Sequence, residues 1–231
     1  LLPKAIGQLH LRRPRLMERL RAGLERRITV VLAGPGHGKI ELLAQFLRES
    51  GEDSVWYSLD ASDRDPSVFF RYLVQGITEH APEFGERSQG LWEGLRCRPQ
   101  EAERMADLFA GDAEESLSGS LVLVLDGVQH IEGSEACVRA LRRLIAGLPG
   151  AIHLVLAGRS LPDLGLESLP ENAVARIEGD DLLFTLEETG ILLREVFGLQ
   201  ATREAVERLH ARTRGWVTAL QLLRQTARLE A

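Results

Sequence analysis

The amino-acid sequence predicts a three-layer α/β sandwich, in which helices cover both faces of a parallel sheet, followed by a small all-α domain. Short, apolar, β-branched segments alternate with amphipathic ones in the first part of the chain, which is typical of parallel strands buried on both faces. After about residue 178 the strand signal stops, and apolar residues recur at spacings of three and four. We therefore expect an α/β domain over residues 1–178 and a helical, lid-like domain over residues 179–231.

Each element is predicted from its own segment. The expected strands are Ile28–Ala33, Ser54–Leu59, Ser120–Leu125, Ile152–Ala157 and Ala173–Ile177. The helices expected in the α/β domain are Arg15–Glu25, Ile40–Glu49, Pro66–His80, Ala102–Leu108 and Cys137–Gly147. Those expected after it are Leu186–Phe197, Arg203–Thr213 and Trp216–Leu229. Thr185 and Glu188 have the spacing of a capping box, whereas residues 82–118 are weakly patterned.

Composition narrows the class of protein. A chain of 231 residues with 44% hydrophobic content can bury one substantial core and a smaller one, and it has no apolar run of membrane-spanning length. Cys97 and Cys137 lack the spacing of a zinc site or a disulfide scaffold. The chain begins at Leu1 without a signal-peptide pattern, so we expect a fragment of a cytoplasmic protein.

The charge is unevenly distributed. The formal net charge is -6, yet residues 1–30 carry eight Lys or Arg against two Glu. No aromatic residues alternate with these arginines, and the remainder of the chain is acidic. A solvated helix face is therefore expected here, rather than a surface that binds nucleic acid directly.

The segment between the first strand and the next helix reads Ala33-Gly-Pro-Gly-His-Gly-Lys39-Ile40, the pattern of a phosphate-binding P-loop. In such a loop, backbone N–H groups and the helix N-terminus face phosphate oxygens, and the Lys ammonium reaches the terminal phosphates. The alternative is an ordinary Gly-rich turn. The predicted nucleotide contacts are Gly34, Pro35, Gly36, His37, Gly38, Lys39, Ile40 and Glu41.

The loop departs from the full pattern at two positions. Ala33 replaces the first Gly, and Ile40 replaces the Ser or Thr that normally follows the Lys. That hydroxyl usually holds Mg²⁺, and a branched alkane cannot coordinate a metal. The loop therefore predicts binding of ATP or ADP more strongly than hydrolysis, with Mg²⁺ possible but without its usual ligand.

Two further residues follow strands at the same predicted edge of the sheet. Asp126 ends an apolar strand and is expected to be catalytic and to hold any metal, while Gly127 leaves no acid to orient water. Arg159 follows the next strand, where open α/β sheets bind ligands, and is expected to be catalytic by sensing the terminal phosphate. A plain surface arginine is an equal alternative for Arg159.

Several of these segments together resemble the signal-transduction ATPases with numerous domains (STAND), in the MalT-like and large LuxR-type branch. Arg13-Pro-Arg-Leu-Met-Glu-Arg-Leu20 is similar to the entry segment of that family. Val55–Asp60, with Asp63-Arg-Asp65-Pro66, is similar to its second strand and the helix that follows. Arg214-Gly-Trp216 and the Thr185 capping box resemble its helical domain.

The resemblance implies an AAA+/STAND-like P-loop NTPase fold and an ATP- or ADP-binding switch in transcriptional regulation. It also implies that Arg13, Pro14 and Arg15 lie on the base or ribose side of the nucleotide. The implied partners are other domains of a longer protein or further copies of the chain. DNA would be bound only through a domain outside this chain, and no membrane is involved.

The chain departs from the family pattern at Ile40, Gly127, Gln129 and Val217, where the family usually has Thr, an acid, His and Pro. Hydrolysis is therefore expected to be slow or lost. An alternative is a pseudo-NTPase that serves as a protein-interaction scaffold. A ring-forming motor ATPase would need a trans-acting arginine, for which the sequence gives no clear candidate. Ile40→Thr combined with Gly127→Asp should create turnover only if the rest of the site is intact.

Overall fold

A computed structural model describes residues 11–86, 88–95 and 99–229 of the chain. Its strands form one parallel sheet in the order β2-β3-β4-β1-β5. The bounds are β1 (Ile28–Leu32), β2 (Ser54–Ser58), β3 (Leu121–Asp126), β4 (Ile152–Gly158) and β5 (Val174–Glu178). The five predicted strands are confirmed, because each overlaps one of these.

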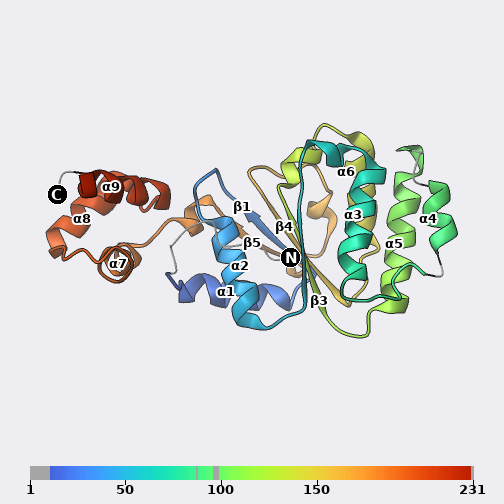
Figure 1. Ribbon diagram of the computed structural model, residues 1–231, viewed down its shortest axis with the longest axis horizontal. Helices are drawn as coiled ribbons and strands as arrows, with labels where there is room; N and C mark the ends of the chain where they lie inside the picture. The colour runs from blue at the N-terminus through green and yellow to red at the C-terminus, as the bar shows by residue number, and fades with distance from the viewer. Residues whose placement is uncertain (1–10, 87, 96–98, 230–231) are drawn as a thin grey trace.

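Helices cover both faces of the sheet (Figure 1). On one face lie α1 (Pro14–Leu24) and α2 (Lys39–Ser50), and on the other lie α3 (Pro66–Thr78), α5 (Ala102–Ser116) and α6 (Glu135–Ala146). Alternate residues of β3 face opposite layers: Val122 and Val124 pack with α1 and α2, while Leu123 belongs to the cluster on the other side. Burial on both faces is the reason the strands are almost entirely apolar. The three-layer fold is thereby confirmed.

The helices differ from prediction in two places within the α/β part. Helix α5 continues to Ser116 instead of ending at Leu108, since Phe109 and Ala113 extend its buried face. Helix α4 (Gln89–Leu95) was not predicted, because its sequence is short and Gly-rich. The short 3-10 segments are η1 (Ala61–Arg64), η2 (Pro99–Glu101), η3 (Val128–Ile131), η4 (Leu166–Ser168), η5 (Glu171–Ala173) and η6 (Gly179–Leu182).

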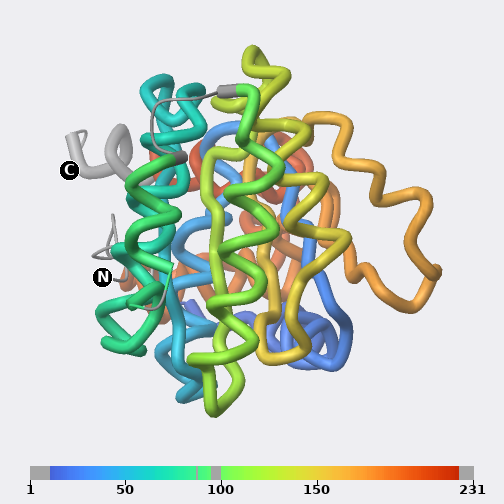
Figure 2. Tube along the Cα trace, turned by 90° about the vertical axis from the view of Figure 1, so that its right-hand side faces the viewer, coloured from blue at the N-terminus to red at the C-terminus, as the bar shows by residue number. Residues whose placement is uncertain are grey.

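After β5 the chain forms a helical segment with its own apolar cluster. It consists of α7 (Leu186–Ile191), the π-helical turn η7 (Leu192–Val196), α8 (Arg203–Thr213) and α9 (Val217–Leu229). The single helix predicted over Leu186–Phe197 is therefore divided at Ile191. Seen from the side of α4 and α5, the red helical segment lies behind the sheet (Figure 2). The domain boundary after residue 178 stays a prediction.

The ends of the last helices follow from local sequence. The predicted capping box of α7 is confirmed: Glu188 N donates to Thr185 Oγ1 at 3.1 Å, and Thr185 N donates to Glu188 Oε2 at 2.9 Å. Arg214 and Gly215, with φ of 50° and 74°, end α8 in the left-handed region, so α9 begins only at Val217.

Cys137 is buried and forms no disulfide, and Cys97 lies outside the described residues. No helix in the described part of the chain is long and apolar enough to cross a membrane.

Candidate functional site

A cavity of about 460 Å³ opens at the carboxyl edge of the sheet, between the loop after β1 and the start of α9. The ends of β2, β3 and β4 form its floor. Among the predicted site residues, those that line it are Arg13, Pro35, Gly36, His37, Gly38, Lys39, Ile40, Glu41, Asp126 and Arg159. Gly34, Pro14 and Arg15 are not among the lining residues. The topology therefore gathers most of the predicted set around one space.

The loop between β1 and α2 has the backbone that phosphate binding requires. Gly36 and Gly38 have φ of 73° and 79°, a conformation that glycine adopts without a steric penalty. Gly38 is the N-cap of α2, and Lys39 is the first residue of the helix. The first-turn N–H groups of an α-helix lack intrahelical acceptors, and together with the helix dipole they favour an anion. This backbone would suit a bound phosphate group.

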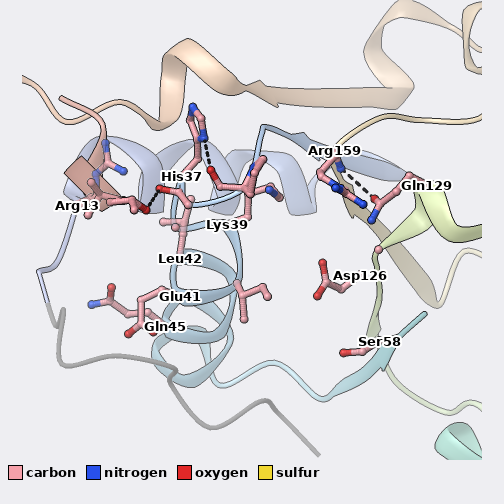
Figure 3. Close-up of a pocket in the computed structure, with 18 of the residues that line it drawn as sticks. Arg13, His37, Lys39, Glu41, Leu42, Gln45, Ser58, Asp126, Gln129 and Arg159 are labelled. Atoms are coloured by element: carbon pink, nitrogen blue, oxygen red, sulfur yellow. Dashed lines mark hydrogen bonds between the residues drawn. The ribbon is translucent and has the colours of Figure 1, made fainter. Parts of the chain in front are cut away.

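Lys39 and Asp126 face each other across the floor of the cavity. The Lys39 Nζ donates to Ala33 O at 2.6 Å and to Gly34 O at 3.0 Å. Burial lowers the pKa of Lys39, and attraction to Asp126 opposes that shift. Burial likewise raises the pKa of Asp126, against the attraction of Lys39. Figure 3 shows Lys39, Asp126 and Arg159 around the same space.

The donor set beside Asp126 is poor for a magnesium ion. Ile40 packs its hydrocarbon side chain against the apolar cluster under α2. Ser58 is a further polar residue beside Asp126, because the two residues pair in the register of β2 and β3. The Ser58 hydroxyl accepts a hydrogen bond from Trp56 Nε1 at 3.1 Å. Among the described residues, no group of three or more His, Cys, Asp or Glu side chains could hold a metal. These residues therefore fit phosphate groups better than they fit Mg²⁺.

Ser58 was not predicted as a site residue. Its position at the carboxyl end of a strand is visible in the sequence, but only the strand order places it next to Asp126.

The backbone at Gly127 leaves little room for an acid after Asp126. Gly127 has φ of 85°, and a Cβ atom there would lie 2.9 Å from Leu59 O and 3.1 Å from His130 Cδ2. An aspartate at this position would be strained and crowded. The double substitution that includes Gly127→Asp would therefore disturb the site. Ile40→Thr alone is the better test of whether a hydroxyl at this position supplies a magnesium ligand.

Arg159 follows β4, lines the cavity and is exposed. Its backbone N–H donates to Gln129 Oε1 at 3.0 Å, so Gln129 connects η3 to the beginning of the loop after β4. The sequence marked Gln129 only as a departure from the family pattern. The phosphate-sensing role of Arg159 stays a prediction.

Arg13 and Arg15 bind the segment that leads into α7. Both guanidinium groups donate to Leu183 O and to the carboxylate of Glu188. Arg13 is buried, and its Cζ lies 4.2 Å from the centre of the Phe184 ring. Its Nε is buried without a partner among the described residues. Arg13 also donates from Nη1 to Leu182 O at 2.9 Å, and its predicted role on the base or ribose side of the nucleotide stays a prediction.

Other arginines of the basic N-terminal run also make contacts within the protein. Arg12 pairs with Glu49, Arg19 pairs with Asp181, and Arg26 donates to the carbonyls of Glu171 and Val174. These arginines of the N-terminal run thus form ion pairs and hydrogen bonds within the protein.

The start of α9 contacts the phosphate loop directly. Thr218 Oγ1 donates to Gly36 O at 2.9 Å, and a Cβ atom at Gly36 would lie only 2.2 Å from that hydroxyl oxygen. The rings of Trp216 and His37 are 6.3 Å apart. Thr218 and Gln221 line the cavity but were not predicted, since no local pattern marks a contact between segments 182 positions apart.

Comparisons with known proteins agree with this fold. No family model matches the chain. Over 94% of its length, it is 28% identical to the HTH-type transcriptional regulator MalT of Vibrio cholerae and 29% identical to that of Yersinia enterocolitica. It spans only 24% of the length of each of these relatives.

Two solved structures show the same fold. A STAND protein with a tetratricopeptide repeat sensor from Pyrococcus horikoshii has a TM-score of 0.58 at 17% identity, over 94% of this chain and 30% of that one. AMPPCP-bound DnaA from Aquifex aeolicus has a TM-score of 0.52 at 18% identity, over 95% of this chain and 64% of that one. The fold class and the family resemblance predicted from the sequence are confirmed.

Proposed function

We propose that this chain, a MalT-like P-loop NTPase of the STAND class, is an ATP- or ADP-binding switch in a transcriptional regulator. One observation carries the proposal. The cavity is bounded on one side by the phosphate loop and on the other by the start of α9, which is hydrogen-bonded to that loop. A nucleotide in this space would touch both parts of the chain.

The described residues can supply the phosphate contacts. The glycines of the loop and the N-terminus of α2 offer backbone N–H donors. Lys39 would exchange its carbonyl partners for phosphate oxygens, and Arg159 adds a second positive charge at the end of β4. Bound Mg²⁺ would screen the phosphate charge, with Asp126 as its carboxylate, but Ile40 offers it no oxygen. We therefore expect this site to hydrolyse ATP slowly or not at all.

Switching requires that ATP and ADP bind two arrangements of the chain with different affinities. The bond between Thr218 and Gly36 is one contact that a nucleotide in the loop would alter. The change of arrangement would act on other domains of a longer protein or on self-association. DNA would be contacted through such a domain. The helical domain, beginning at residue 179, would be the part that changes orientation.

The test begins with identification of any nucleotide released when the purified protein is heat-denatured. Calorimetric titration with ATP and ADP, each with Mg²⁺ and with EDTA, then measures affinity. We expect binding that persists in EDTA and that falls at least tenfold in Lys39→Met, because an ion pair with phosphate is removed. Arg48→Met, at the other end of α2, is the control and should bind as the parent chain does.

A second candidate is a pseudo-NTPase scaffold that binds partner proteins without using nucleotide. Ile40 and the left-handed Gly127 favour it, because both remove catalytic chemistry. Absence of both ATP and ADP binding in the same titrations would support this function and refute the nucleotide switch.

A further inference from the structure

We propose that the side-chain amide of Gln129 recognises the terminal phosphate, so that Gln129 distinguishes a nucleoside triphosphate from a diphosphate. This inference rests on the proposed nucleotide function and deepens it. Gln129 is a position that the sequence marked only as a departure from the family pattern.

The carboxamide of Gln129 is held in one orientation. Gln129 lies in η3, is half-buried and lines the cavity. Its Oε1 accepts the backbone N–H of Arg159 at 3.0 Å (Figure 3). An amide oxygen that accepts from a main-chain donor directs the amide nitrogen to the opposite side.

The neighbouring glycine makes room for this arrangement. A Cβ atom at Gly158 would lie 2.6 Å from Gln129 Oε1 and 3.0 Å from Val128 Cγ2. A Cβ atom at these distances would require the Gln129 carboxamide and Val128 to shift. The end of β4 and the carboxamide of Gln129 therefore fit each other only because residue 158 is glycine.

The free end of the carboxamide has the chemistry of an anion contact. Gln129 Nε2 carries two N–H donors, and neither has a hydrogen-bond partner in the described part of the chain. Lys39 and Arg159 line the same end of the cavity. Because a P-loop Lys reaches the terminal phosphates, donors grouped with Lys39 and Arg159 lie where the terminal phosphate of a triphosphate would be.

A carboxamide neither gives up nor takes a proton at neutral pH, so Gln129 is suited to binding and not to proton transfer. Its bond to Arg159 also makes it a positioning residue, since the Arg159 side chain projects from the backbone that Gln129 holds.

The experiment compares Gln129→Glu with the parent chain in calorimetric titrations with ATP and with ADP. A glutamate can still accept the Arg159 N–H, but it replaces the two donors by negative charge. We expect the affinity for ATP to fall at least about tenfold, because charge-assisted hydrogen bonds to phosphate are lost. The affinity for ADP should change less than about twofold.

Gln45→Glu is the charge control, because Gln45 also lines the cavity and is half-buried but lies on α2, away from Arg159. It adds the same charge and should leave the ATP-to-ADP preference unchanged. Its melting temperature is also measured, because Gln45 Nε2 donates to Glu49 Oε1 at 2.9 Å. Gln129→Ala, with the melting temperature measured, provides a second variant if Gln129→Glu folds poorly, and it should also weaken ATP more than ADP.

Equal loss of ATP and ADP affinity in the Gln129 variants, or no loss, would overturn the inference while leaving nucleotide binding intact. Absence of binding by the parent chain to both nucleotides would instead refute the proposed function itself.

Discussion

Arg13 and Glu188, 175 positions apart in the chain, form a buried ion pair in which Arg13 Nη2 lies 2.9 Å from Glu188 Oε2. The same carboxylate accepts from Arg15 and from Thr185 N, where it closes the capping box of α7. The carboxylate of Glu188 thus caps the first turn of α7 and also binds the N-terminal segment through Arg13 and Arg15.

Glu188→Ala should destabilise the protein by about 3–5 kcal/mol, because it leaves the buried Arg13 guanidinium without its counter-charge and removes half of a capping box. Urea unfolding followed by circular dichroism measures the loss. The control is Glu187→Ala, on the exposed face of the same turn, which should cost less than about 0.5 kcal/mol. Similar losses in the two variants would contradict this account.

The same carboxylate predicts an acid-sensitive component of stability. Burial tends to raise the pKa of Glu188, but hydrogen bonds from Arg13, Arg15 and Thr185 outweigh it and lower the pKa below the ordinary value. A depressed folded-state pKa contributes stability that is present above the unfolded value, about 4.3, and that is lost as the pH falls through the folded value. The melting temperature should therefore fall more steeply below about pH 4.3 in the parent chain than in Glu188→Gln. If the melting temperatures of the two proteins fall equally steeply with pH, protonation of Glu188 is not coupled to unfolding.

Ile40→Thr should restore a magnesium ligand. The affinity for ATP with Mg²⁺, relative to EDTA, should rise about tenfold, since the threonine hydroxyl would offer the metal an oxygen ligand that isoleucine lacks. Ile40→Val is the control, because valine has nearly the shape of threonine and no hydroxyl. Calorimetry with and without Mg²⁺ measures the effect, and a gain in both variants would point to a change of packing instead.

Gly215→Ala tests the contact between the α8–α9 turn and the segment before α7, and Gly111→Ala is its control. Gly215 has φ of 74°, and a Cβ atom there would lie 2.1 Å from Phe184 O. Gly215→Ala should therefore destabilise by about 2 kcal/mol or more. Gly111, within α5, has no neighbour near its Cβ position, so Gly111→Ala should stabilise by about 0.5–1 kcal/mol. Thermal unfolding distinguishes the two, and a stable Gly215→Ala protein would rule out the close packing.

Local sequence predicted much of the fold because the signals for strands and helix ends are themselves local. The strands are recognisable because residues such as Val122 and Leu123 are apolar on both faces. The start of α7 was predictable because Thr185 and Glu188 bond within one turn. Helix α4 was not predictable, because its seven residues are held by packing from elsewhere, as Trp92 Nε1 donating to Asp112 shows.

The sequence predicts the succession of strands and helices along the chain and the chemistry of the loop at Lys39. Propensity, capping and glycine spacing act between residues that are close together in the chain. Only the tertiary structure decided that Thr218 bonds to Gly36, that Gln129 holds Arg159, and that Arg13 pairs with Glu188. These contacts join segments whose approach depends on strand order and on the packing of whole layers. No short pattern in the chain carries that information.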